Sequence, residues 1–155
     1  MQTFLPYPNF SLSAQALDNK RLGKQRLEAW QILEVLRQKR ELGFNMDVGW
    51  LTHPAVRMWE GYEPALCEYG LAICGEWQRR AFESTIHTRL EARYRELGRL
   101  VLNRDLPYWF GDERLHSSHR AALLFKNPEF YGTKNWSELP VINYWWPIQE
   151  KSNGA

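Results

Sequence analysis

Residues 18–36 read DNKRLGKQRLEAWQILEVL and predict the first long helix of the fold. At about 100° per residue, four apolar side chains of this stretch fall on one narrow stripe. We expect this stripe to face the core: Leu22, Ala29, Leu33 and Leu36. Asp18 and Arg26 project onto the same stripe. Because a charged group at a core position is costly without a partner, these two require either a structural ion pair or a role in a ligand or catalytic site.

A second, polar line runs beside the apolar stripe of the same helix. It consists of Arg21, Gln25 and Glu28, which stand one above another because they are four and three residues apart. Lys20 and Lys24 are expected on the opposite, outer side. There the two lysines serve either as a solvated surface or as contacts to phosphate groups.

The flanking sequence predicts further helices and no strands. Ser11 or Ser13 is expected to cap the first helix, which runs to about Arg40. Apolar spacing and cap residues predict four more helices, over residues 54–59, 62–82, 84–101 and 113–126. Gly70 and Gly75 are small enough to let a neighbouring helix approach closely. The fold class is therefore all-α, a compact single-domain bundle of about four to five helices with long aromatic-rich loops.

Length and composition indicate one domain, at residues 1–150, with a frayed tail at 151–155. The sequence has no apolar run near the roughly 20 residues that span a bilayer, and we expect a cytoplasmic protein without a membrane or obligatory protein partner. Cys67 and Cys74 are expected to be buried thiols. The net charge is only +2, so nucleic-acid affinity requires local clustering of cations.

Other candidate ligand-binding residues lie outside the first helix. His53 precedes a proline at a helix start, where it either caps the helix or helps to bind an anion. His116, His119 and Arg120 lie within one turn and are expected to converge on one anionic group of the substrate. Among the aromatic residues, which include Trp50, we take Tyr62 as a substrate-binding candidate. A His-x-x-His pair alone is weak evidence for zinc, so we expect no metal and no cofactor.

Five segments together resemble a known family: MQTFLPYPNF, ALDNKRLGKQRLEAWQIL, THPAVRMWEGYEPAL, LAICGEWQRR and LHSSHRAALLFKNPEFY. They resemble the bacterial and phage proteins called pyrimidine dimer DNA glycosylases, a group similar to the endonuclease V type of repair enzyme. The resemblance extends over nearly the whole chain. It implies a single helical domain that acts on duplex DNA containing a damaged or modified pyrimidine.

The resemblance also implies a set of catalytic residues. Members of the phage type attack the sugar with an N-terminal α-amine and use a helix-borne glutamate beside arginines. On this sequence the glutamate matches Glu28, and Arg21 and Arg26 are the best matches for the arginines. The amine belongs to Met1, which bulky Gln2 should cause the cell to retain. Such chemistry combines glycosylase and lyase steps.

The alternatives belong to two other classes of protein. The modest net charge and the absence of a small second residue are compatible with a non-catalytic module that binds DNA or a nucleotide. An enzyme of modified-base or nucleotide metabolism on the same fold is the other alternative. Lys20 and Lys24 rank below Met1 as amines, since both project away from Glu28 on the helical wheel.

Overall fold

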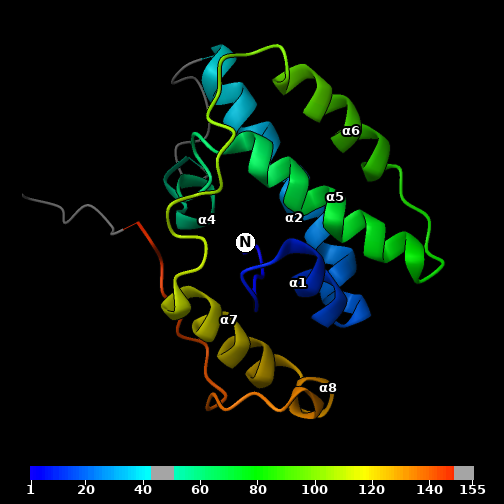
Figure 1. Cartoon of the computed structure of the whole chain (residues 1–155), viewed down its shortest axis with the longest axis vertical. Helices are drawn as coiled ribbons and strands as arrows, with labels where there is room; N and C mark the ends of the chain where they lie inside the picture. The colour runs from blue at the N-terminus through cyan, green and yellow to red at the C-terminus, as the bar shows by residue number, and fades with distance from the viewer. Residues whose placement is uncertain (43–50, 149–155) are drawn as a thin grey trace, which may run out of the picture.

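The computed structural model describes residues 1–42 and 51–148 of the chain. Two long helices, α2 (Asn19–Leu42) and α5 (Glu63–Arg79), cross at its centre, and α6 (Ile86–Leu97) packs along α5 (Figure 1). The remaining elements are α1 (Phe10–Ala16), α4 (Pro54–Arg57), α7 (Glu113–Lys126), α8 (Pro128–Tyr131) and the 3-10 helix η1 (Gly132–Lys134).

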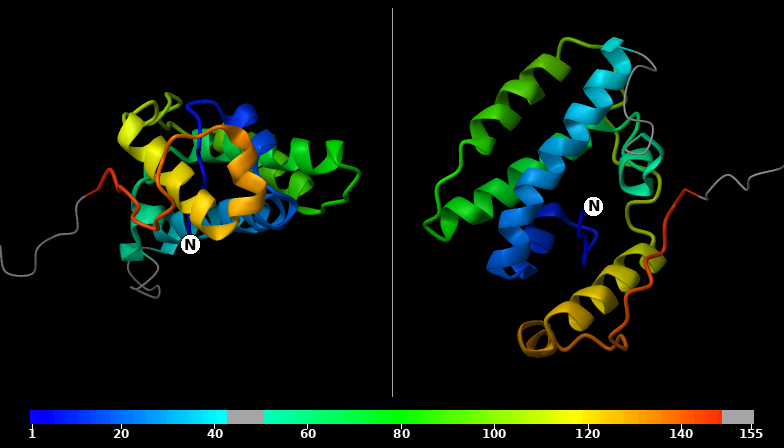
Figure 2. Two further views of the ribbon diagram at one scale, coloured as in Figure 1. Left: turned by 90° about the horizontal axis from the view of Figure 1, so that it is seen from below. Right: turned by 180° about the vertical axis from the view of Figure 1, so that it is seen from behind.

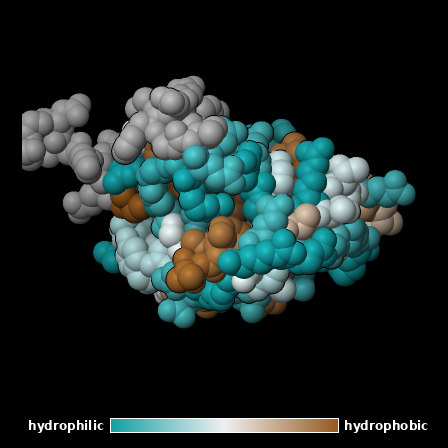
Figure 3. Space-filling view, turned by 90° about the horizontal axis from the view of Figure 1, so that it is seen from above, coloured by the Kyte–Doolittle hydropathy of each residue, from teal (hydrophilic) through white to brown (hydrophobic). Residues whose placement is uncertain are grey.

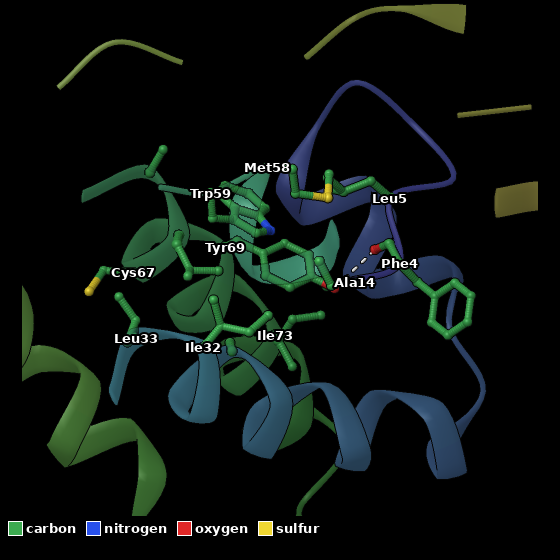
Figure 4. Packing of buried hydrophobic residues seen from close by; sticks show 14 of the residues in the cluster. Phe4, Leu5, Ala14, Ile32, Leu33, Met58, Trp59, Cys67, Tyr69 and Ile73 are labelled. Atoms are coloured by element: carbon green, nitrogen blue, oxygen red, sulfur yellow. Dashed lines mark hydrogen bonds between the residues drawn. The ribbon is translucent and has the colours of Figure 1, made fainter. Parts of the chain in front are cut away.

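The N-terminal segment enters the space between these helices. In Figure 1 the N terminus lies among α1, α2, α4 and α7, and Figure 2 shows it from behind. Leu5 is fully buried in the core and Phe4 almost so. Figure 4 shows Leu5 beside Met58 and the backbone of Phe4 at the hydroxyl of Tyr69 on α5. The first residues are therefore part of the core.

One glycine sets the distance between the central helices. A Cβ atom at Gly70 would lie 3.3 Å from the Ala29 Cβ atom on α2 and 2.9 Å from a Leu90 methyl group on α6. This confirms the prediction for Gly70. Gly75 was wrongly expected to serve the same purpose, since a Cβ atom there would meet nothing within 4 Å.

The first helix is interrupted, contrary to the sequence prediction. Asn9, rather than Ser11 or Ser13, caps α1, and the chain becomes extended at Leu17. Asp18 then precedes α2, and its Oδ1 atom accepts a hydrogen bond from the Arg21 backbone N. Asp18 is therefore a helix-capping residue, because a carboxylate that binds the free N–H groups of a first turn favours a new helix start.

Three further predictions about the fold agree with the structure. The described residues contain four long helices and no strand, which confirms the all-α class. The apolar stripe of α2 is buried, and so are the two free thiols. Within the described part, no helix has the length and apolar character that a membrane span requires. Figure 3 shows one face of the molecule, which is mainly hydrophilic with small apolar areas. Trp50 and the tail at 151–155 lie outside the described residues.

Candidate active site

Two side chains of α2 hold the backbone of the N-terminal segment. Gln25 accepts a hydrogen bond from Phe4 N at 3.0 Å through Oε1 and donates one to Gln2 O at 2.9 Å through Nε2. Glu28 Oε2 accepts a hydrogen bond from Gln2 N at 2.6 Å. Gln25 is 1% exposed and Glu28 is 7% exposed. Because hydrogen bonds are strengthened and unpaired groups penalised in the interior, this pairing fixes the position of residues 2–4.

Two further groups hold the same segment, one in the turn after α4 and one on α5. Trp59 Nε1 donates to the Thr3 hydroxyl at 3.0 Å. The Tyr69 hydroxyl lies 2.7 Å from Gln25 Oε1 and 3.0 Å from Phe4 O, and its one proton is available to either acceptor. The segment thus has polar partners from several helices.

The α7 side chains that we expected to bind a substrate anion hold the N-terminal segment instead. His116 accepts from Gly111 N through Nε2, so its Nδ1 atom donates to Leu5 O at 2.7 Å. His119 Nδ1 accepts from Leu5 N at 2.9 Å. Arg120 donates to Pro6 O at 2.8 Å and pairs with Glu138 and Glu113. The sequence placed these three residues together correctly, but their partners come from the chain itself.

The buried imidazole of His119 makes the stability of the fold sensitive to acid. Burial, together with the nearby His116, lowers the pKa of His119 from an ordinary 6.5 to about 3. Between these pH values the unfolded chain binds a proton that the folded chain does not, so the free energy of unfolding falls as the pH falls. From pH 6.5 to pH 5 we expect a loss of about 2 kcal/mol from this residue.

Denaturant unfolding at several pH values checks this expectation. His119→Asn should flatten the pH dependence between 6.5 and 5. The matched control is His87→Asn, because His87 lies partly exposed on α6 beside Glu91. An unchanged slope in His119→Asn would contradict the assignment.

The fixed N-terminal segment forms one wall of a cleft of about 380 Å³. This volume is within the range of small-molecule and cofactor pockets. The cleft combines one carboxylate with four cations, and the residues that line it are Met1, Gln2, Phe4, Lys20, Arg21, Lys24, Gln25, Glu28, Lys126, Ile142 and Tyr144.

The cations of the cleft act on one another. Burial lowers the pKa of Lys126, at the end of α7, and Arg21 and Lys24 lower it further while Glu28 opposes them. Cations brought this close create a positive potential that favours a negatively charged ligand. The cleft therefore has the charge of a phosphate-binding site.

Asp18 orients one of these cations and is not itself open to a ligand. Its Oδ2 atom accepts from Arg21 Nη1 at 2.7 Å and from Asn127 at 3.1 Å, and Oδ1 accepts from the Tyr131 hydroxyl at 2.8 Å. Burial raises the pKa of Asp18, but the hydrogen bonds from Tyr131 and Asn127 and the charge of Arg21 outweigh it and lower the pKa overall. We expected Asp18 to contact substrate; in the structure its carboxylate is instead hydrogen-bonded to side chains of the protein itself.

The structure also corrects the positions of two cations relative to Glu28. Arg26 points away from the cleft, donating to the Ser84 hydroxyl at 2.7 Å and lying over the Trp77 ring at 4.3 Å. Residues two apart on a helix are about 200° apart, so Arg26 and Glu28 cannot share a face. Lys24 Nζ, by contrast, lies 3.7 Å from Glu28 Oε1, because a spacing of four residues returns to the same face.

His53 and Tyr62 lie at the starts of helices and are not among the described residues that line the cleft. His53 Nδ1 accepts from Ala55 N at 3.0 Å and caps α4. Burial lowers the pKa of His53, the charge of the N-terminal amine lowers it further, and Glu28 opposes both. The charges of the N-terminal amine and of Glu28 thus both act on the imidazole of His53.

Five residues of the cleft were missed by the sequence interpretation. They reach it from the first segment, the end of α7 and the chain that follows η1: Gln2, Phe4, Lys126, Ile142 and Tyr144. Nothing in the local sequence around them signals a site.

The fold and the cleft define an all-α protein with a cationic, carboxylate-bearing site suited to a phosphate-bearing ligand. More specifically, the chain belongs to the pyrimidine dimer DNA glycosylase family, whose model matches residues 1–90. This range includes the N-terminal segment, α2 and α5. Searches of curated proteins and of solved structures give no significant match.

Proposed function

We propose that the protein is a DNA glycosylase that releases a damaged or modified pyrimidine from duplex DNA and then cuts the abasic strand as a lyase. Family membership supports the glycosylase step. The observation that carries the proposal is the N-terminal segment, which is hydrogen-bonded to Glu28 at Gln2 N and brings Met1 into a cationic cleft.

We propose the α-amine of Met1 as the nucleophile. Met1 lines the cleft with Glu28, and the hydrogen bond at Gln2 restrains its position. Lys24 is the alternative amine, since its Nζ atom lies near Glu28 Oε1, but its side chain is 70% exposed. As a class, α-amines lose their proton at lower pH than lysine side chains, so more of them are nucleophilic at neutral pH.

Base release requires one amine and one proton carrier. The neutral amine attacks C1′, and the bond from C1′ to the pyrimidine nitrogen breaks with its electron pair leaving on the base, which takes a proton from water. Glu28 accepts the proton that the bound amine loses. It then gives this proton to O4′ as the C1′–O4′ bond opens, which leaves a protonated imine at C1′.

Strand cleavage uses the same carboxylate. Glu28, ionised again, removes a proton from C2′, and the C3′–O bond breaks with its electron pair leaving on the phosphate. Water then hydrolyses the imine and restores the amine. No cofactor enters this sequence of steps.

The four cations of the cleft are proposed to hold phosphate groups of the DNA. Lys126→Ala should then reduce the slope of the logarithm of the binding constant against the logarithm of salt concentration by about 1. The matched control is Lys39→Ala, because Lys39 lies near the other end of α2 and pairs with Glu60. Equal slopes for the wild type and Lys126→Ala, measured by fluorescence anisotropy, would contradict the phosphate contact.

A panel of duplexes tests the proposed function. Duplexes containing pyrimidine dimers, oxidised or alkylated pyrimidines, or abasic sites are incubated with the wild-type protein, and released base and strand breaks are measured. We expect base release from at least one lesion and strand cleavage at abasic sites. Binding without base release or cleavage across the panel would favour a non-catalytic DNA-binding module and refute the enzyme.

A further inference from the structure

The chain after η1 forms a fixed strap along α7, which we define as residues 138–145 (Figures 1 and 2). Its first residue, Glu138, pairs with Arg120. Farther along, Val141 N donates to Ala121 O at 3.2 Å and Trp145 N donates to the Ser118 hydroxyl at 3.1 Å. These contacts hold the backbone of the strap on both sides of residue 142.

The strap presents an exposed aliphatic side chain at the cationic cleft. Ile142 is 46% exposed and lines the cleft together with Lys20, Lys24 and Lys126. Val141 has nearly the same exposure, 48%, but is not among the described residues that line the cleft. The lining of the cleft also includes Met1, Phe4 and Tyr144. Because an isoleucine gains nothing from phosphate groups, the apolar part of this lining suggests contact with an apolar part of the same ligand.

We infer that Ile142 enters the base stack of duplex DNA as a wedge when the cations of the cleft hold the flanking phosphates. This inference rests on the proposed function and names a residue that opens the duplex. Apolar side chains inserted at a base step partly unstack it and kink the duplex, at an energetic cost repaid by backbone contacts. The face of a base is the apolar surface that a phosphate-binding cleft meets in DNA.

Duplex opening is measured with 2-aminopurine beside a tetrahydrofuran analogue of an abasic site, since this base becomes fluorescent when it is unstacked. The analogue cannot form an imine, so the proposed lyase step does not cut the duplex during the measurement. Wild-type protein should bind and raise the fluorescence. Ile142→Ala should still bind through the cations but lower the equilibrium constant for unstacking roughly tenfold. Val141→Ala, on the same strap with similar exposure, should behave as the wild type, and Ile142→Leu should retain the response.

The outcomes separate the wedge from the proposed function. An equal fluorescence rise with wild type and Ile142→Ala overturns the wedge while leaving the glycosylase proposal intact. An equal loss in Val141→Ala and Ile142→Ala also overturns it, since the effect would then belong to the strap as a whole. Absence of duplex binding by the wild-type protein overturns the proposed function, and the wedge with it. Thermal unfolding of each variant confirms that the folded protein is compared.

Discussion

Glu28→Gln should lower the single-turnover rate of base release by about 10³-fold, which is within the range of general acid–base catalysis. The amide retains an oxygen that can accept the hydrogen bond from Gln2 N, so the N-terminal segment should stay in place. The amide cannot, however, take up the proton of the attacking amine. We therefore expect DNA binding to change less than threefold.

Glu41→Gln is the matched control for this substitution. Glu41 lies on the same helix but pairs with Arg37 on the exposed surface. Quench-flow measurement under enzyme excess compares the three proteins. A wild-type rate of base release in Glu28→Gln would show that Glu28 does not transfer a proton in the reaction.

Gln25→Leu should destabilise the protein by about 3 kcal/mol, because it leaves buried polar groups without partners. The groups affected are Phe4 N and Gln2 O, which Gln25 holds directly. The Tyr69 hydroxyl keeps Phe4 O as an acceptor. With the N-terminal segment released from α2, Met1 should leave the cleft, and base release should fall even at temperatures where the variant is folded.

Urea unfolding and base-release assays on the same samples check both parts of this expectation. Gln15→Leu is the control, since Gln15 is exposed on α1. Wild-type stability in Gln25→Leu, or wild-type activity in the folded variant, would contradict the proposed role of Gln25 in holding the N-terminal segment.

The fold was predictable from local signals where a cap or an apolar stripe coincides with a helix end. Asp112 caps α7, and the helix runs over Glu113–Lys126 as its sequence predicts. The break between α1 and α2 was missed because Asp18 fits the apolar spacing of one continuous helix. Only the cap geometry at Arg21 N distinguishes a helix start from a helix interior.

The candidate site was predictable along one helix face and not across the chain. Arg21, Gln25 and Glu28 do line one cleft, since their spacing alone places them together. The partners of His116 and His119 could not be predicted, because Leu5 lies more than 100 residues away in sequence. Lys126 and Ile142 are likewise brought to the cleft by tertiary packing.

We propose that the fold fixes the N-terminal segment so that the amine of Met1 reacts beside Glu28. Borohydride trapping on an abasic-site duplex, followed by peptide mass mapping, tests it most directly, since reduction makes the imine permanent. We expect an adduct on the peptide that begins at Met1, formed equally well by Lys24→Ala. An adduct on Lys24, or none when the strand is cleaved, would contradict it.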